Sequence, residues 1–428
     1  MKKAALHNLG CKVNAYETEA MQQMLEAAGY EIVPFNEPAD VYVVNTCSVT
    51  NMADRKSRQM LHKAKKNNPD SIVVATGCYV QTSEQEALED LSIDIVIGNN
   101  RKHELVSLIE EFAKDNVLDI NHEKQEFEEL FVSQTAEHTR AFIKVQDGCN
   151  QFCSYCIIPY ARGRVRSRKL ENVIDEVMRL ASNGYKEVVL TGIHLSSYGV
   201  DFEDETDLLA LIQAVNRVDG IERIRLGSLE PKIVTEEFAS ALSQMPKVCP
   251  HFHLSLQSGC DATLKRMNRR YTAEEYETGC RLLRKYFKHP AITTDVIVGF
   301  PGESDEEFET TYENLADLEL SFFHVFPYSK RNGTKASTLK GEINGKVAKA
   351  RVARLLELSN ACRERDMKRF NPVQVLIERK QDGYYTGYTN QYHPCKILSD
   401  TPLSGRITIE WDRIEDGTYY GKKDVVCD

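Results

Sequence analysis

The sequence lacks the features that would place it in a specialised class of protein. No apolar run approaches the roughly 18 residues of a membrane-spanning helix, and the opening MKKAALH lacks the apolar stretch of a signal peptide. No internal repeat or low-complexity tract is present. We therefore expect a globular protein that works in the cytoplasm and has no membrane partner.

An excess of positive charge is also missing. The 428 residues include 54 Lys and Arg against 64 Asp and Glu, which gives a formal net charge of −10. This balance argues against a protein that binds nucleic acid by bulk electrostatic attraction, although it allows a local basic groove. With 42% hydrophobic and 28% charged residues, the composition is that of an ordinary globular chain of two or three domains.

Cysteine, by contrast, is abundant. Twelve cysteines without a signal peptide argue against a disulfide framework, because the cytosol keeps thiols reduced. Clustered cysteines in such a protein more often bind metal or carry out redox chemistry. Six of them show no convergence, and we interpret them as packing or surface thiols: Cys249, Cys260, Cys280, Cys362, Cys395 and Cys427.

The first hundred residues alternate short β-rich runs with amphipathic helical stretches. Strands are expected at 4–9, 41–45, 72–75 and 93–97, with helices between them. This alternation predicts a parallel sheet with helices on both faces. We assign residues 1–114 to this domain and the polar, acidic stretch 115–138 to a linker.

The alternation resumes over residues 139–366, with expected strands at 142–145, 187–190, 224–226, 253–256, 291–298 and 322–325. About six strand–helix units predict a partial (β/α)6 version of the eight-unit parallel barrel. After Pro372 the pattern changes to short strands with Gly and Asn turns, at 373–378, 384–388, 406–411 and 425–426. Residues 367–428 are therefore expected to form a small closed antiparallel β-barrel. The predicted fold class is α/β with these three parts.

Three cysteines follow the first expected strand of the central domain. Cys149, Cys153 and Cys156 lie in the sequence GCNQFCSYC. A loop this short can wrap three thiolates around one face of an iron–sulfur cubane, whose usual complement is four cysteines. The fourth iron then has no protein ligand, and an open metal position is what substrate chemistry needs. A structural zinc site would require a fourth Cys or His, which this loop lacks; zinc or simple buried thiols are the alternatives.

Cys11, Cys47 and Cys78 are far apart in the sequence but share a context. Each comes just after an expected strand. In a parallel sheet the carboxyl ends of the strands lie on one edge, where ligands of open α/β folds bind. The three thiols are therefore expected to project into one crevice. The alternative is that they are small packing residues, since cysteine is among the most buried residue types.

The most basic run, RGRVRSRK, lies just after the central cysteine loop. Its arginines alternate, so in an extended segment Arg162, Arg164, Arg166 and Arg168 would share one face, suited to RNA phosphates. A solvated charged segment explains the same run.

The loop around Cys149 resembles the cluster loop of the radical S-adenosylmethionine superfamily. The resemblance implies a [4Fe–4S] cluster whose open iron chelates S-adenosylmethionine, and an electron from that cluster that releases a 5′-deoxyadenosyl radical. It also implies that the cosubstrate lies against the loop and the ends of successive barrel strands. The candidate residues are Tyr155, Thr191, Gly192, Ser228, Glu230, Gln257, Ser258, Gly299 and Glu303. Gly-rich turns after strands are also common packing features.

Longer motifs extend the resemblance over nearly the whole chain. GCKVNAYE from Gly10, NTCSVT from Asn45 and CIIPYARGR from Cys156 are similar to the methylthiotransferases of that superfamily. This resemblance implies that Cys11, Cys47 and Cys78 bind an auxiliary [4Fe–4S] cluster and that the C-terminal domain is an RNA-binding TRAM domain. Two molecules of S-adenosylmethionine would then be used, one to methylate sulfur and the other to generate the radical.

The family acts on isopentenyl-modified adenosine in tRNA, on threonylcarbamoyl-modified adenosine in tRNA, or on an aspartate of a ribosomal protein. Lys12-Val13-Asn14 and the VQDG before Cys149 most resemble the threonylcarbamoyl group. The implied partners are a tRNA anticodon stem-loop, an electron donor such as flavodoxin or ferredoxin, and a sulfur donor. An alternative of another class is a non-catalytic iron–sulfur protein for electron transfer or RNA scaffolding, which should ligate each cluster with four residues.

Overall fold

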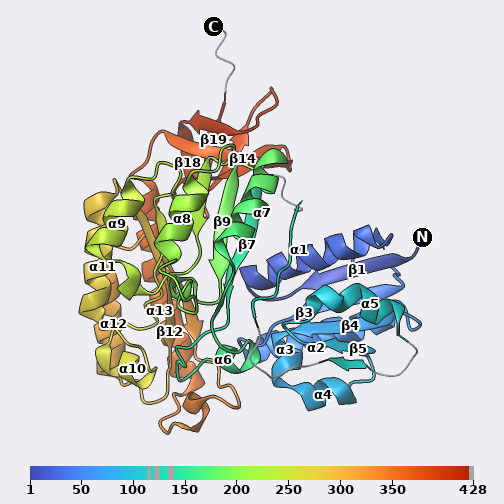
Figure 1. The fold of residues 1–428 in the computed structure, drawn as a ribbon. Helices are drawn as coiled ribbons and strands as arrows, with labels where there is room; N and C mark the ends of the chain where they lie inside the picture. Colours follow the sequence, from blue (N-terminus) through green and yellow to red (C-terminus); the bar gives the residue numbers. More distant parts are fainter. Residues whose placement is uncertain (113–116, 120–125, 134–138, 424–428) are drawn as a thin grey trace.

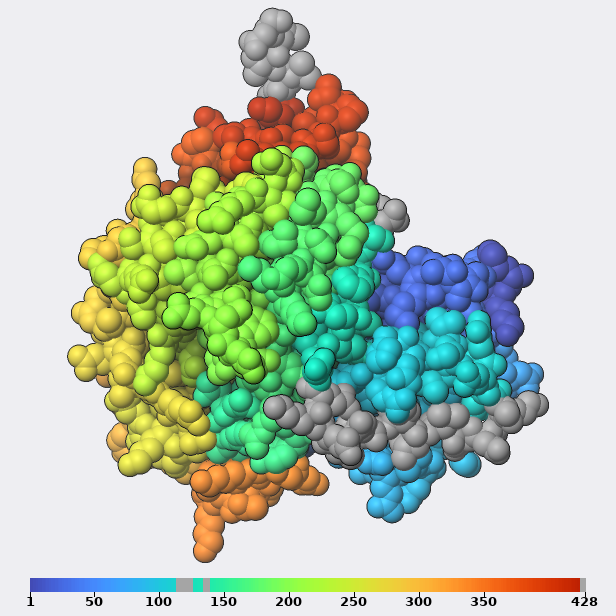
Figure 2. Space-filling view, in the orientation of Figure 1, coloured from blue at the N-terminus to red at the C-terminus, as the bar shows by residue number. Residues whose placement is uncertain are grey.

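The computed structural model describes residues 1–112, 117–119, 126–133 and 139–423. In this part of the chain, helices long and apolar enough to cross a membrane are absent. The N-terminal domain, in blue and cyan, and the C-terminal domain, in red, pack on different sides of the central domain (Figures 1 and 2).

The N-terminal domain is a six-stranded parallel sheet with helices on both faces, as predicted. Its strand order is β2-β1-β3-β4-β5-β6. The helices form because apolar residues recur on one face of each, and two separate hydrophobic clusters cover the two sides of the sheet. The strands are β1 (Lys3–Asn8), β2 (Glu31–Ile32), β3 (Val41–Thr46), β4 (Ile72–Gly77), β5 (Ile95–Ile97) and β6 (Val117–Asp119). The helices are α1 (Lys12–Ala27), α2 (Asn51–Asn67), α3 (Cys78–Thr82), α4 (Glu84–Glu89) and α5 (Leu105–Glu110).

The segment expected to be a linker contributes to the fold. Strand β6 lies inside it and pairs in parallel with β5, so that, with the short β2, the sheet has two strands more than the four predicted. Further along, Leu130 and Val132 pack against Tyr16 and Ala20 of α1. The acidic composition of the segment concealed these apolar contacts. Residues 115–116, 120–125 and 134–138 of the expected linker lie outside the described residues.

The central domain is the predicted partial barrel of six parallel strands. One sheet has the order β10-β9-β7-β8 and a second has the order β11-β12-β13. Single parallel bridges, Ile224–Val248 and Leu229–Leu254, join the two. The strands are β7 (Arg140–Asp147), β9 (Glu187–Gly192), β10 (Arg223–Leu226), β11 (His251–His253), β12 (Ala291–Val298) and β13 (Phe322–Pro327), with β8 (Arg166–Ser167) antiparallel to β7. Strand β11 ends earlier than the predicted 253–256, because the chain beyond it pairs only by isolated bridges.

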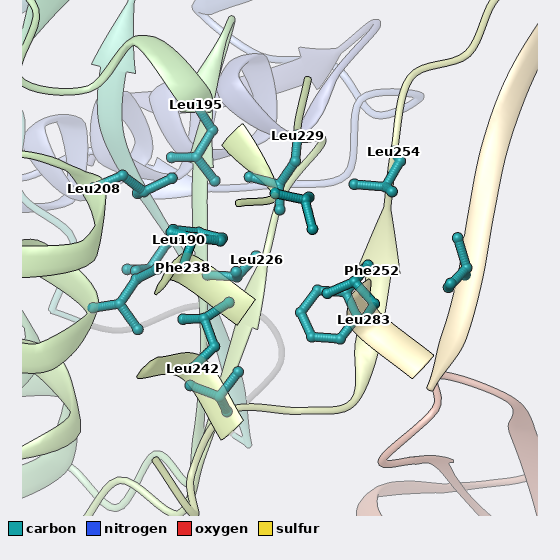
Figure 3. Close-up of a cluster of buried hydrophobic side chains, with 14 of the residues drawn as sticks. Leu190, Leu195, Leu208, Leu226, Leu229, Phe238, Leu242, Phe252, Leu254 and Leu283 are labelled. Atoms are coloured by element: carbon teal, nitrogen blue, oxygen red, sulfur yellow. The ribbon is translucent and has the colours of Figure 1, made fainter. Parts of the chain in front are cut away.

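Helices cover the outside of this barrel. They are α6 (Ile158–Ala161), α7 (Leu170–Ser182), α8 (Leu208–Asn216), α9 (Glu236–Ser243), α10 (Asp261–Arg266), α11 (Ala273–Tyr286), α12 (Asp305–Asp317) and α13 (Gly345–Met367). Short 3₁₀ helices occur at η1 (Lys102–Glu104), η2 (Leu195–Ser197), η3 (Pro231–Ile233) and η4 (Lys335–Thr338). Figure 3 shows the core between strands and helices, where Leu190, Phe238 and Leu242 meet. Burial of such side chains contributes about 1.5–3 kcal/mol each and holds the helices on the strands.

The C-terminal domain is a six-stranded sheet with the order β17-β14-β15-β16-β19-β18. All pairs are antiparallel except β16–β19. Its two outer strands are separated along the chain by Glu410 alone, so the chain bends there and the sheet curls into a half-barrel, in agreement with the predicted antiparallel β domain. The strands are β14 (Val373–Gln381), β15 (Tyr384–Thr389), β16 (Pro394–Leu398), β17 (Arg406–Ile409), β18 (Trp411–Glu415) and β19 (Thr418–Lys422). The expected strand at 425–426 lies outside the described residues.

A buried network of charges joins the N-terminal domain to the barrel. Glu17 of α1 accepts hydrogen bonds from Lys144 of β7 (2.8 Å) and from Arg162 (2.9 and 3.0 Å), and pairs with Lys102 at 3.3 Å. Asp147 pairs with Lys144 at 2.7 Å and with Arg162 at 3.1 Å. Burial alone would raise the pKa of Glu17, but the charges of Arg162, Lys102 and Lys144 outweigh burial and hold that pKa well below its usual range.

We predict that Glu17→Gln destabilises the protein strongly, because it removes the carboxylate that three buried cations share. Breaking a buried ion pair in this way costs about 3–5 kcal/mol. The measurement is the free energy of unfolding of the metal-free protein in urea at pH 7. Glu26→Gln, on the exposed side of the same helix, is the control and should change that free energy by less than about 0.5 kcal/mol. If the two substitutions changed the free energy of unfolding equally, the buried ion pairs of Glu17 would not contribute to stability as described.

Candidate active site at the domain interface

The central cysteine loop turns sharply after β7. Gly148 has a φ of +68°, and a Cβ there would lie 1.8 Å from the carbonyl oxygen of Arg164, so only glycine fits. The Cys149 amide donates to the carbonyl of Gly163 (3.1 Å), and the Cys156 amide donates to the carbonyl of Cys153 (2.9 Å). These contacts fold the loop back on itself.

All three cysteines of this loop line one pocket of about 140 Å³. Burial raises the pKa of Cys149 to about 11 and that of Cys156 to about 12, and the charge of the neighbouring Cys153 thiol adds to both shifts. The three thiols are thus close enough to influence one another. Among the described residues, however, neither this triplet nor another group of three Cys, His, Asp or Glu is closed around the position of a single metal ion.

Four of the nine expected cosubstrate residues line the same pocket. They are Tyr155, Ser228, Glu230 and Gln257. They come from the cysteine loop and from successive strand ends, as the resemblance implied.

The other five expected cosubstrate residues are not among those that line the pocket. Thr191 is buried and Gly192 packs against Gln146 at the end of β9. The buried Ser258 lies in hydrogen-bonding distance of the Thr311 hydroxyl. Gly299 lines a separate cavity of about 470 Å³ beside α13, and the buried Glu303 accepts from the Gly299 amide and pairs with Arg351. Glu303 therefore has a local partner, which a Gly-rich motif does not reveal.

Arg269 is a pocket residue that the sequence did not reveal. Its guanidinium lies 3.0 Å from the Sγ of Cys153 and 3.8 Å from the carboxylate of Glu230. Glu230 is also 3.3 Å from His194 and accepts from Gln151 at 3.2 Å. Arg269 thus contacts both the cysteine loop and a strand-end carboxylate of the pocket. No motif surrounds Arg269, so a single sequence carries no signal for it.

The N-terminal cysteines lie at the carboxyl ends of β1, β3 and β4. Cys11 precedes α1 and is exposed, whereas Cys47 and Cys78 are buried. A Cβ at Gly10, whose φ is +103°, would lie 2.7 Å from the Sγ of Cys47, so glycine allows this close approach. Burial raises the pKa of Cys47 to about 11, and the charges of Cys78 and Cys11 act in the same direction. The structure therefore brings these three thiols together at one edge.

The two cysteine triplets lie on adjoining elements. Cys78 is the first residue of α3, and α6 comes directly after the Cys156 loop. Helices α3 and α6 are side by side in Figure 1, and the Asn99 side chain donates to the carbonyl of Ala161 at 2.8 Å. The interface between the domains thus holds both triplets.

The arginines of the basic run do not share a surface, contrary to the sequence-based expectation. Arg162 and Arg168 are fully buried, and Arg166 is buried beside Asp147. Arg168 pairs with Glu129 at 2.8 Å and with Glu176 of α7. Carboxylates from distant parts of the chain attract them inward. Arg164 alone of the four is exposed, with its guanidinium 4.6 Å from the centroid of the Phe152 ring.

The inside of the barrel is polar rather than packed with apolar side chains. Along the strands, alternate residues such as His251, His253 and Asp295 face away from the apolar outer core. They help to line a cavity of about 440 Å³, which we call the central chamber, whose walls also include Lys12 of α1 and the loop at Tyr392. A polar cavity of this size fits a ligand of moderate size.

The C-terminal domain forms part of the chamber because barrel arginines hold one of its loops. Arg223 of β10 donates to the carbonyl of Tyr388, and Arg225 donates to the carbonyl of Asn390, both at 3.0 Å. Arg225 is itself anchored by Glu187 at 2.9 Å. The loop thereby presents Tyr392 to the chamber.

The chamber adjoins the pocket of the central triplet. Ser228 lines both the chamber and the pocket of Cys149, Cys153 and Cys156. At another wall the chamber is lined by Lys12, which follows Cys11 in the chain. A ligand in the chamber would therefore lie near the central triplet and would contact the residue next to Cys11.

Comparisons with known proteins agree with this arrangement. A family model described as "Radical SAM superfamily" matches residues 143–315, and one described as "Uncharacterized protein family UPF0004" matches residues 3–98. The chain is 40% identical over 418 residues to threonylcarbamoyladenosine tRNA methylthiotransferase MtaB of Bacillus subtilis (strain 168), covering 95% of this chain and 93% of the relative.

Two further relatives carry different names. Identity is 44% to the MtaB protein of Aquifex aeolicus (strain VF5), over 85% of this chain and 89% of the relative. Identity is 37% to tRNA-2-methylthio-N(6)-dimethylallyladenosine synthase of Clostridium novyi (strain NT), over 88% of this chain and 86% of the relative. Among solved structures, the radical S-adenosylmethionine methyltransferase TsrM from Kitasatospora setae, with cobalamin and a [4Fe-4S] cluster bound, shares the fold with a TM-score of 0.56. That similarity has 18% identity and covers 76% of this chain and 72% of TsrM.

We predict that iodoacetamide alkylates Cys11 first in the metal-free protein. Alkylation requires the thiolate, and a pKa of about 11 leaves roughly one Cys47 in a thousand ionised at pH 8. Labelling of Cys47 should therefore rise about tenfold per pH unit above pH 8. Mass spectrometry of the labelled peptides measures the labelling rates of Cys11 and Cys47. Cys280 is the slowly reacting reference, because burial raises its pKa to about 12. Equal labelling of Cys47 and Cys11 at pH 8 would contradict the burial described.

Proposed function

Because this chain belongs to the radical S-adenosylmethionine methylthiotransferase family, we propose that it methylthiolates carbon 2 of threonylcarbamoyladenosine next to the tRNA anticodon. Family membership makes it a tRNA methylthiotransferase with two [4Fe–4S] clusters and S-adenosylmethionine as cofactors. The alternative of a non-catalytic iron–sulfur protein is thereby removed. The observation that supports the proposal most is the chamber that adjoins the pocket of the central triplet and is lined by Lys12, the residue after Cys11.

We assign the two clusters to the two triplets. Cys149, Cys153 and Cys156 would hold the cluster that binds S-adenosylmethionine, since they share a pocket with strand-end polar groups. Cys11, Cys47 and Cys78 would hold the auxiliary cluster. When bound, these groups supply the deoxyadenosyl radical and the methylated sulfur.

The residues of this chain then position and protect the reaction. Arg269 holds Cys153, while Glu230 and Gln257 offer polar contacts to the cosubstrate. The chamber walls place the adenine ring between the two centres and limit water, which a primary-carbon radical requires. A low-potential protein such as flavodoxin or ferredoxin would deliver electrons, and a separate donor would renew the sulfur.

The threonylcarbamoyl substrate is favoured by two observations. The relatives named for it include those at 40% and 44% identity and two at 36%, whereas relatives named for dimethylallyladenosine are at 35–37%. In addition, most side chains that line the chamber are charged or polar, which suits a polar group better than an apolar isopentenyl chain. The exposed Arg164, beside Phe152 and Tyr160, is our remaining candidate for contact with RNA from the basic run.

We predict that the two triplets separate two partial activities. The reconstituted protein should hold about eight iron atoms. A triple variant in which Cys149, Cys153 and Cys156 are all changed to Ala should hold about four iron atoms and should no longer cleave S-adenosylmethionine reductively. Cys11, Cys47 and Cys78→Ala should keep formation of 5′-deoxyadenosine but lose the methylthio product. Iron analysis and chromatography of both products are the measurements. If the variant that lacks Cys11, Cys47 and Cys78 still methylthiolates RNA at the parent rate, these three cysteines are packing residues.

We predict strong discrimination between the two modified adenosines. A site that hydrogen-bonds the threonylcarbamoyl group leaves its polar groups unpaired around an isopentenyl group, at a cost of about 1–3 kcal/mol for each. The test is competition between anticodon stem-loops that carry either modification, with products identified by mass spectrometry of nucleosides. Equal reaction of the isopentenyl RNA would overturn the proposed substrate while leaving the family assignment intact.

A further inference from the structure

Two cationic side chains of the central chamber lack a carboxylate partner in the described part of the chain. The Nζ of Lys12 lies 6.0 Å from the ring centroids of both Phe142 and Tyr392. The guanidinium carbon of Arg363, on α13, lies 3.6 Å from the centroid of the Phe322 ring. Aromatic contacts stabilise a cation only modestly, by about 0.5–2 kcal/mol. Both side chains therefore keep donors free for an anionic ligand.

Two carboxylates also line the chamber, Asp295 and the exposed Asp416. Asp295 lies 3.4 Å from His253, and His393 lies 3.0 Å from Asp366. Burial lowers the pKa of His251 and of His324, so both are neutral near pH 7. Neither chamber carboxylate forms an ion pair with Lys12 or Arg363, so a carboxylate group that entered the chamber would meet two cations without a carboxylate partner among the described residues.

The environment of Lys12 strengthens this expectation. Its side chain is exposed and lines the chamber, so its ammonium faces the space that a ligand would occupy. Because Lys12 is adjacent to Cys11, a ligand anchored there would also lie beside the N-terminal triplet.

We propose that Lys12, assisted by Arg363, binds the carboxylate of the threonyl group of the substrate nucleoside in the central chamber. This inference rests on the proposed function, because the threonylcarbamoyl group carries a carboxylate and the isopentenyl group does not. An apolar group in this position would leave both cations desolvated without compensation. Lys12 is thus a residue that determines specificity.

The test combines a change in the protein with a matched change in the substrate. Wild type and Lys12→Met are compared on anticodon stem-loops whose threonylcarbamoyl group has either a free carboxylate or its methyl ester. Lys12→Met should lower kcat/KM for the acid by about 10- to 100-fold, the loss expected for one hydrogen bond between charged groups. The same substitution should change kcat/KM for the ester by less than about twofold, and wild type should already disfavour the ester.

Three controls distinguish a loss of carboxylate recognition from a general loss of folding or cluster loading. Lys56→Met removes an equal charge from the exposed surface of α2 and should not change the acid-to-ester ratio. Lys12→Arg keeps the charge and should retain most of the preference for the acid. Iron content and 5′-deoxyadenosine formation without RNA should match wild type in every variant. If Lys12→Met fails to load iron, Arg363→Met provides the same comparison from a helix outside the N-terminal domain.

The outcomes are distinct. Equal losses on acid and ester, or no loss on either, would overturn the inference while the proposed function stands. A wild-type enzyme that uses the isopentenyl stem-loop as well as the threonylcarbamoyl one would overturn the proposed function itself. A loss confined to the acid supports both.

Discussion

The structure depends on one buried network of charges, the one that Glu17 and Arg162 form with Lys102, Lys144 and Asp147. Glu17 lies on the helix that begins after Cys11, whereas Asp147 and Arg162 flank the loop of the central triplet. Arg162 also donates to the side chain of Asn14 at 2.7 Å. The contacts that join the domains are therefore the contacts that set the two cysteine triplets at a defined separation. Since a substrate radical must meet sulfur at short range, this rigidity serves the chemistry directly.

An apolar interface could have joined the domains at least as strongly, because burying charges removes them from water at a high cost. Each ion pair in the network, however, is satisfied in one relative position of the two domains. Sliding α1 along β7 would leave buried charges without partners, whereas an apolar interface would tolerate small shifts. Here the network favours a single docking geometry, which a reaction between two fixed centres requires.

Local periodicity was enough to predict the architecture, and the placement of both triplets at strand ends followed from the parallel sheets. The network could not be predicted, because Glu17 is 145 residues from Arg162 in the chain. For the same reason the arginines of the basic run were taken for an RNA surface: their partners Glu17, Asp147 and Glu176 do not stand beside them in the sequence. Arg269 was missed because no motif surrounds it and its partner Cys153 is 116 residues away in the chain. The central chamber was missed because three domains contribute to its walls. Strand β6 was missed because its few residues lie in acidic surroundings.

The bend at Glu410 has a consequence for how the protein behaves at high concentration. An open sheet presents a row of unpaired amides and carbonyls to which another chain can add as a further strand. In the C-terminal sheet the two outer strands are short, four residues in β17 and five in β18, and the chain bends between them at Glu410. The pairing of β18 with β19 is also irregular between Trp411 and Arg413. Short and irregular edges are poor templates for a further strand, so a small domain at the periphery of the molecule can stay open to solvent and to a large polyanion without promoting aggregation.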